Sequence, residues 1–215
     1  LNWSTVRNAS TGTATATYTS NTTNSSAIYT QRISFSRSII RQIHRTYLFF
    51  DLSSIAGTIT DLTLSVLGGG GSSSTSVTVI KSTAWGGSGG TSTLATGDFG
   101  NVDFATSYLS GVNPTTWNTS SYNVYDIGNA VSDANTNGYI NCALVESDHD
   151  YANVDPTLNT SYQAGVEFLD PTNKIKVEVT YTPAGYGNDV IGVASANIDS
   201  VVGVASADIS KVIGV

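Results

Sequence analysis

Ile59-Thr-Asp-Leu-Thr-Leu-Ser-Val-Leu67 alternates apolar and polar side chains and places Leu62, Leu64 and Val66 on one face of an extended chain. Successive side chains of a β-strand point to opposite faces, so a period of two residues indicates a strand with one buried face. The segment from Lys174 to Tyr181 alternates in the same way. Both segments therefore predict strands whose apolar sides face a core.

Other runs with strand character recur on both sides of this segment. They are Thr13–Thr19, Ala27–Phe35, Thr46–Leu52, Ser76–Ile80, Tyr122–Asp126 and Tyr139–Val145. Glycine-rich loops lie at residues 68–71 and 86–90. One helix is predicted over Ile127–Asn137, because apolar residues recur there at spacings of three and four and Asp126 can cap the first turn. We expect an all-β protein, an antiparallel jelly-roll-like β-sandwich with one short helix and a C-terminal repeat tail.

Composition excludes several classes of partner. Charged residues make up 12% of the 215 residues, against about 25% in an average protein. Nine basic and sixteen acidic residues give a net charge of −7, which disfavours nucleic-acid binding because proteins that contact phosphate groups are basic. No run of about 18 apolar residues is present, so we expect no membrane insertion. The single cysteine, Cys142, cannot form an intrachain disulfide, and we expect it to be buried.

The C-terminal segment repeats with a period of eleven residues. Val190–Ser200 is followed by Val201–Lys211, and a third copy begins at Val212. Repeat arrays need about three stacked units to bury their apolar faces, and this tail has only two complete units and the start of a third. We therefore expect its apolar residues to be buried against another chain or against copies of itself. The glycine at the third position of each unit disfavours a helix, and we expect strands or turns.

We therefore divide the chain into a sandwich domain at residues 1–182, a linker at 183–189 and an assembly arm at 190–215. The apolar residues expected to form the assembly interface are Val190, Ile191, Val193, Ile198, Val201, Val202, Val204, Ile209, Val212 and Ile213.

The densest group of ionisable residues is Glu146-Ser-Asp-His-Asp150. Asp148, Asp150 and Asp155 are weak candidates for a calcium site, because carboxylates in loops suit that ion. The regular spacing of a calcium-binding loop is absent, and a solvated loop is the preferred interpretation. No Gly-x-Ser-x-Gly motif occurs, and the two histidines lie in dissimilar surroundings. We predict no catalytic residues, no metal site and no cofactor.

Arginines gather at Arg32, Arg37, Arg41 and Arg45, with Arg7 elsewhere. The spacing of four between the last three suits one helical face, but the same residues also suit two strand ends and a turn. Two interpretations stay open. The arginines pair with acidic groups of a neighbouring subunit, or they balance charge within a surface loop.

Trp85 and Trp117 are candidate glycan contacts, because sugar rings stack on indole rings. Each lies beside a strand and a loop, where it also suits the edge of a sandwich core, and we favour the core.

Three phrases carry a family resemblance. They are Tyr47-Leu-Phe-Phe-Asp-Leu-Ser-Ser-Ile55 with Gly57–Leu67, then Gly97-Asp-Phe-Gly-Asn101, and the terminal strand Lys174–Thr182. Together they resemble the DNRLRE-type β-sandwich domains of bacterial surface proteins and their relatives in phage particles. The repeat tail resembles short repeats at the C-termini of phage structural proteins. The resemblance implies a sandwich fold and an extracellular or particle-bound setting, and it implies no reaction.

These observations predict a non-enzymatic virion structural protein of a bacteriophage. It would be a capsid decoration protein or a fibre or tail surface component, located on the virion surface. Its expected partners are other virion or surface-assembly proteins and copies of itself, with adhesion to host-surface glycans as an additional role. The alternative is a carbohydrate-binding module of a secreted or cell-surface protein.

Overall fold

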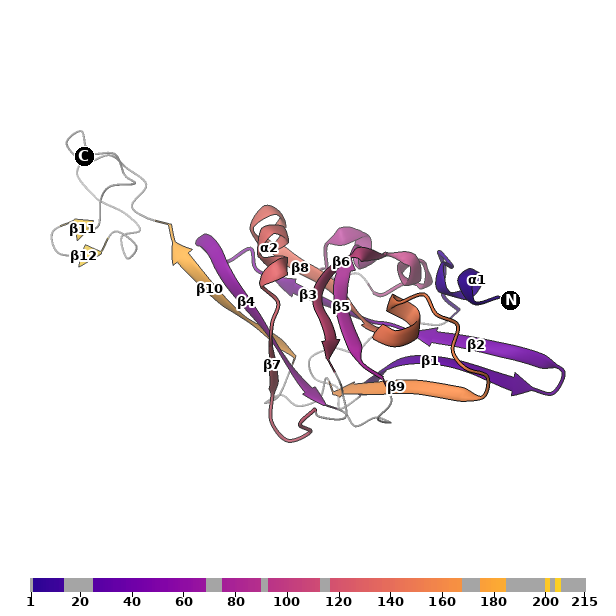
Figure 1. Cartoon of the computed structure of the whole chain (residues 1–215). Helices are drawn as coiled ribbons and strands as arrows, with labels where there is room; N and C mark the ends of the chain where they lie inside the picture. Colours follow the sequence, from indigo (N-terminus) through magenta and orange to yellow (C-terminus); the bar gives the residue numbers. More distant parts are fainter. Residues whose placement is uncertain are drawn as a thin grey trace.

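The computed structural model describes residues 2–13, 25–68, 75–89, 93–112, 117–167, 175–184, 200–201 and 204–205. In this part of the chain, two antiparallel β-sheets pack against each other as a sandwich, and short helices lie at its edges (Figure 1). The predicted all-β sandwich is confirmed.

The larger sheet has the strand order β10-β4-β9-β1-β2, and β7 also pairs with β4. Its strands are β1 (Ser25–Phe35), β2 (Ser38–His44), β4 (Gly57–Gly68), β7 (Asn123–Asp126), β9 (Thr160–Glu167) and β10 (Lys176–Pro183). Leu64 of β4 is opposite Val177 of β10 and also opposite Tyr125 of β7. The strand predicted from Ile59–Leu67 therefore lies between two neighbouring strands.

The smaller sheet has the order β3-β8-β5-β6. Its strands are β3 (Thr46–Asp51), β5 (Val77–Ser82), β6 (Val102–Val112) and β8 (Tyr139–Glu146). The register between β5 and β6 shifts at several points, so this edge of the sheet is irregular.

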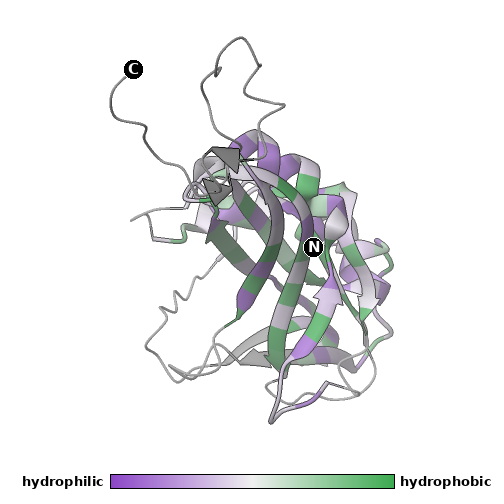
Figure 2. Ribbon diagram, turned by 90° about the vertical axis from the view of Figure 1, so that its left-hand side faces the viewer, coloured by the Kyte–Doolittle hydropathy of each residue, from purple (hydrophilic) through white to green (hydrophobic). Residues whose placement is uncertain are grey.

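One hydrophobic core fills the space between the sheets. Leu62, Leu64 and Val66 of β4 are buried against the smaller sheet, which contributes Ile140 and Leu144 from β8. Hydrophobic and hydrophilic residues alternate along the strands, as Figure 2 shows. Cys142 is buried in this core, and burial raises the pKa of its thiol to about 12.

The predicted helix is present as two consecutive segments. A 3₁₀ turn, η4 (Gly128–Ala130), leads into α2 (Val131–Asn137). The side chain of Asp126 accepts a hydrogen bond of 2.6 Å from the N–H of Gly128. Gly138 ends the helix in the left-handed conformation, with φ at 73°, which favours glycine.

A second helix, α1 (Trp3–Arg7), was not predicted from the sequence. The side chain of Asn2 caps it by accepting a 2.8 Å hydrogen bond from the N–H of Thr5. The remaining short elements are η1 (Ala84–Gly87), η2 (Thr96–Gly100) and the π-helical turn η5 (Ser147–Tyr151).

In the tail, β11 (Ser200–Val201) pairs with β12 (Val204–Ala205) as an antiparallel two-stranded sheet separate from the sandwich. This pairing is of the strand type that the glycine spacing favours. The linker after Ala184 and the other interface residues predicted in the tail lie outside the described residues. The interface residues concerned are Val190, Ile191, Val193, Ile198, Val202, Ile209, Val212 and Ile213.

Candidate assembly interface

A buried ion pair joins Arg45, directly before β3 of the smaller sheet, to Asp150 in the turn after β8. Nε and Nη2 of Arg45 donate to Oδ2 and Oδ1 of Asp150, each at 2.8 Å. Nη1 of the same guanidinium donates to the backbone oxygen of Phe99 at 2.7 Å, and Nη2 donates to that of Arg7 at 2.9 Å. Four of the five N–H donors of this guanidinium are thereby used inside the chain, which makes this contact a structural one.

Arg7 brings helix α1 into the same network. Its Nη2 donates to the backbone oxygen of Tyr151 at 3.3 Å, and its guanidinium lies 3.8 Å from the centre of the Phe104 ring. Burial lowers the pKa of Arg7, and the nearby charge of Asp150 opposes this shift. Arg7 thus fastens the N-terminal helix to the sandwich.

Glu146 organises the turn that follows β8. Its carboxylate accepts from the backbone N–H groups of Asp148, His149 and Asp150, at 2.9, 2.8 and 3.1 Å. The hydroxyls of Thr30 and Thr75 donate to the same carboxylate, which is fully buried. These contacts satisfy a buried charge. The solvated loop expected from the sequence is therefore wrong for this group, because Glu146, His149 and Asp150 are buried and only Asp148 is exposed.

The three candidate calcium ligands do not form one site. Asp150 binds Arg45, and Asp155 binds Arg41 with hydrogen bonds of 2.9 and 2.7 Å. Asp148 is exposed. Within the described ranges, no group of three or more His, Cys, Asp or Glu side chains is gathered as a metal site would require.

The arginines of the basic run bind acidic residues of their own chain, with one exception. Arg45 pairs with Asp150, and both Arg41 and Arg32 pair with Asp155. Subunit pairing is therefore the wrong interpretation for these three. Arg37 lies in the turn between β1 and β2 and forms no ion pair with any described residue.

The end of the β1–β2 hairpin projects beyond the rest of its sheet (Figure 1). Strand β9 begins at Thr160, opposite Arg32, so the pairs from Ile33 and Ile40 outward have no third strand beside them. This end is a two-stranded ribbon closed by a turn at Ser36 and Arg37. Isolated two-stranded hairpins are marginally stable in water, so a projecting one benefits from a partner.

Most of the exposed large apolar side chains lie on this hairpin or on the loop that precedes β9. Six large hydrophobic residues are exposed in the described part of the chain. Four of them lie on the ribbon or on the neighbouring loop: Phe35 at 67%, Ile39 at 45%, Val154 at 51% and Leu158 at 42%. We call these four residues the apolar tip.

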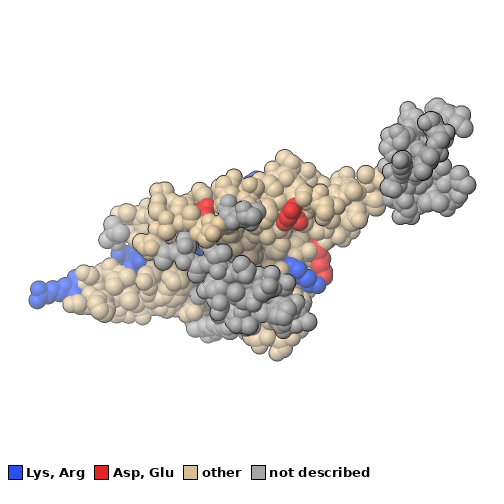
Figure 3. All heavy atoms as spheres, turned by 180° about the vertical axis from the view of Figure 1, so that it is seen from behind, with Lys and Arg blue, Asp and Glu red and all other residues tan. Residues whose placement is uncertain are grey.

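Hydrogen bonds hold the loop against the hairpin. The N–H of Asn159 donates to the backbone oxygen of Arg32 at 2.6 Å, and Oδ1 of Asn159 accepts from the N–H of Ser34 at 2.8 Å. A basic group marks the far end of this projection in Figure 3. Exposed large apolar side chains are unusual on a small projecting element of a soluble protein, so the apolar tip is the candidate assembly interface.

Sequence reasoning missed the apolar tip. Phe35 and Ile39 belong to opposite faces of the hairpin, because Ser34 rather than Phe35 is opposite Ile39. An alternating pattern predicts one buried face, whereas here both faces carry an exposed apolar residue. The available signal was apolar residues on either side of a short Ser-Arg-Ser turn.

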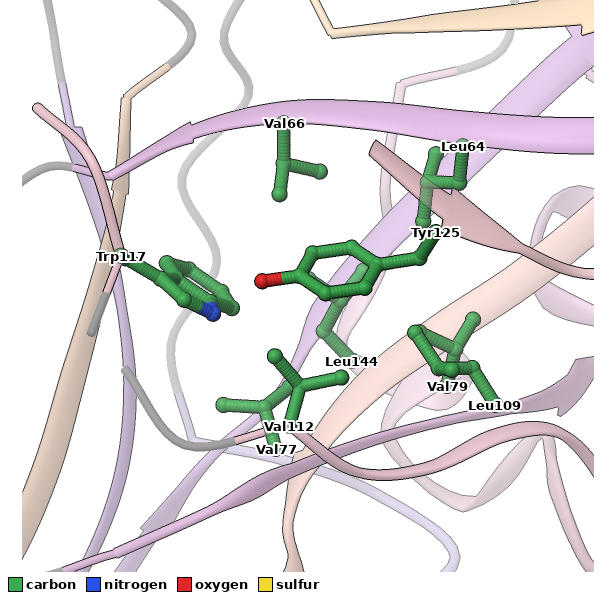
Figure 4. Close-up of a pocket in the computed structure, with 9 residues that line it drawn as sticks. All are labelled: Leu64, Val66, Val77, Val79, Leu109, Val112, Trp117, Tyr125 and Leu144. Carbon is green, nitrogen blue, oxygen red and sulfur yellow. The ribbon is translucent and has the colours of Figure 1, made fainter. Parts of the chain in front are cut away.

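Trp117 is not available to a glycan. It is 8% exposed and lines a cavity of about 10 Å³ between the sheets, with Val66, Val77 and Tyr125 among its neighbours (Figure 4). The preferred core assignment is correct for this residue. Trp85 is half-buried, packs edge-on against Tyr47 at 6.4 Å and has a φ of 56°, which is strained for a bulky residue.

A polar hollow of about 190 Å³ lies between α2 and the end of β5. Its lining residues are Lys81, Ser82, Thr83, Gly87, Tyr108, Asp133, Asn137, Tyr139 and Asn141. Asp133 accepts from Nζ of Lys81 and from the hydroxyl of Tyr108, each at 2.5 Å. The net effect of the surroundings is a lowered pKa for Asp133. Burial alone would raise it, but the two hydrogen bonds and the charge of Lys81 outweigh the effect of burial.

No family model, no curated protein and no solved structure matches this chain. Among the described residues, no helix is long and apolar enough to cross a membrane.

Proposed function

We propose that this chain is a non-enzymatic structural subunit of a virion surface or a comparable extracellular assembly. In a bacteriophage it would serve as a capsid decoration protein or as a fibre or tail component. The apolar tip carries this proposal, because Phe35 and Ile39 leave a projecting ribbon exposed on both faces. The sandwich is displayed, and its apolar segments bind partners.

The interior supports a displayed, durable domain. Arg45, Asp150 and Glu146 are buried, and each has several hydrogen-bond partners inside the chain. These internal contacts suit a domain that is displayed on a particle surface.

The repeat tail gives the second line of support. Each unit begins with two large apolar residues followed by glycine, as at Val190, Val201 and Val212. Two and a third units of this kind cannot bury their own apolar faces. A subunit that carries them gains stability when a neighbour covers them.

The test replaces apolar residues of the tail in the full-length chain. A variant carries serine at the first two positions of every unit: Val190, Ile191, Val201, Val202, Val212 and Ile213. The matched control carries Ser195→Asn and Ser206→Asn in the same units. Sedimentation velocity should show assemblies for the wild type and the control, and monomers for the tail variant. Assembly of the tail variant at the wild-type concentration dependence would remove the role given to the tail.

Glycan binding is the second candidate function, and the polar hollow favours it. The hollow offers hydroxyl, amide, carboxylate and ammonium groups beside the ring of Tyr139. Oδ1 of Asn141 is buried and has no hydrogen-bond partner among the described residues, while its Nδ2 donates to the backbone oxygen of Ala84 at 2.7 Å. A few converging polar groups in a hollow are typical of small-ligand sites.

Calorimetric titration with cell-surface oligosaccharides tests this candidate. Asn137→Ala, inside the hollow, should weaken binding, and Asn129→Ala, an exposed residue outside it, should not. If no oligosaccharide of the panel produces heat with the wild-type chain, the glycan function is rejected.

A further inference from the structure

We propose that the apolar tip of one copy binds the repeat tail of a second copy, so that subunits join head to tail. This inference rests on the assembly function proposed above and names the two surfaces that meet. The apolar tip of one copy is the binding surface, and the repeat tail of the neighbouring copy is the segment that binds to it.

The tip has the features of a surface that accepts an added strand. Strand β2 is the last strand of its sheet, so one of its edges has no strand partner in the described structure. Beyond Arg41 it also lacks the support of β9 on the far side of β1. An added strand would form backbone hydrogen bonds along β2 and cover Ile39.

The tail has the matching composition. Its units are rich in valine and isoleucine, which favour strands, and the described pairing of β11 with β12 shows that this sequence forms strands. Each complete unit carries one acidic residue, Asp199 in the first and Asp208 in the second, and the second unit also carries Lys211. These acids suit a surface that is both apolar and basic.

The charge of the hairpin is complementary to those acids. Residues 25–45 contain four arginines and no acidic residue. Three of these arginines are used inside the chain, and Arg37 remains at the turn. An aspartate of a neighbour's tail therefore finds, at Arg37, a positive charge that no described acidic residue neutralises.

The positions of the two segments favour a neighbour over the chain itself. The C-terminal end of β10 and the turn of the β1–β2 hairpin lie at opposite ends of the molecule (Figure 1). Six peptide units from Ala184 to Val190 span at most about 20 Å, whereas the 11 residues of β1 alone extend over about 36 Å. Val190, the first residue of the tail, thus cannot lie at the tip of its own chain. Head-to-tail contacts use two different surfaces, and they produce rings or filaments.

Mixing two variants of the full-length chain tests this arrangement. The tip variant is Phe35→Ser with Ile39→Ser, and the tail variant is the six-serine chain described above. Each variant alone should sediment as a monomer, because it lacks one of the two surfaces. An equimolar mixture should form a one-to-one dimer and nothing larger, because the intact tip of one binds the intact tail of the other. Circular dichroism confirms that both variants are folded.

Other outcomes overturn the inference in distinguishable ways. If the tail variant alone forms dimers, the tips bind each other. If the tip variant alone assembles like the wild type, the tails bind each other. Both outcomes reject head-to-tail docking and leave the assembly function standing. A wild-type chain that stays monomeric at every concentration, and in the presence of particle proteins, would instead reject the assembly function itself.

A charge exchange adds an independent measurement. Arg37→Glu should weaken assembly several-fold, and so should Asp199→Lys with Asp208→Lys. Combining the three changes in one chain should restore assembly toward the wild-type level, since opposite charges again meet. A combined chain weaker than either parent would show that these charges do not meet.

Discussion

Each end of the β1–β2 hairpin carries an arginine, and the two arginines differ in burial and in pairing. At the inner end, the guanidinium of Arg45 is buried and all its hydrogen bonds go to residues of the same chain. At the outer end, Arg37 has no ionic partner in the described structure and Phe35 is exposed. The inner end therefore stabilises the fold, and the outer end carries the surface that we propose for assembly. This separation predicts that substitutions at the two ends affect different properties.

Asp150→Ala should have the largest effect on stability. It leaves the guanidinium groups of Arg45 and Arg7 buried without their counterion, which typically costs about 3–5 kcal/mol. Urea unfolding followed by circular dichroism measures the loss. Asp148→Ala, at an exposed position two residues earlier, is the control and should change the free energy of unfolding by less than about 0.5 kcal/mol. Equal effects of the two substitutions would show that the inner end is not the electrostatic anchor of the subunit.

Glu146→Gln should have the next largest effect, although it keeps the size of the side chain. Both carboxylate oxygens accept hydrogen bonds, including three from backbone N–H groups. The amide nitrogen of glutamine is a donor, so it faces other donors in either orientation, which costs about 1–3 kcal/mol. Glu178→Gln, on an exposed side chain of β10, is the matched control and should be nearly neutral. A neutral Glu146→Gln would mean that the turn after β8 forms without this carboxylate.

Sequence patterns predicted those parts of the fold that depend on local periodicity. Strand β4 and helix α2 were found from apolar spacing, and Leu62, Leu64 and Val66 are buried as expected. Helix α1 was missed because five residues contain no periodic signal. The position of α1 on the sandwich depends instead on contacts with residues far away in the sequence, such as those of Arg7 with Tyr151 and Phe104.

The contacts that matter most have no signature in the sequence. Arg45 and Asp150 are 105 residues apart, and no spacing rule connects them. The run around Arg37 suited a helix or two strand ends, and pairing with the rest of the sheet decides for strands. The exposure of Phe35 depends on where β9 begins, which alternation within β1 does not reveal.

Asp155→Asn should give a smaller, pH-dependent effect near the middle of the hairpin. The hydrogen bond from Arg41 lowers the pKa of the Asp155 carboxyl, and the charge of Arg32 adds to this shift. A carboxyl whose pKa is lower in the folded state stabilises the fold above its unfolded value of about 3.9. That contribution is lost as the pH falls through the folded value.

At neutral pH the partly exposed ion pair should contribute about 0.5–1 kcal/mol. The difference between wild type and Asp155→Asn, measured by urea unfolding, should be constant above about pH 5 and shrink on acidification below about pH 4. A difference that grows with acidification would contradict the assigned ion pair.

Phe35→Ser should have the smallest effect on stability and the clearest effect on assembly. The side chain is 67% exposed, so its removal should change the free energy of unfolding by less than about 0.5 kcal/mol. Self-association, followed by sedimentation velocity, should weaken markedly, because an aromatic side chain that becomes buried in an interface contributes strongly to binding. Val124→Ser, which removes another exposed apolar side chain on β7, is the control and should leave association unchanged. Equal losses of association from both substitutions would indicate non-specific hydrophobic contact, and they would abolish the distinction between the two ends of the hairpin.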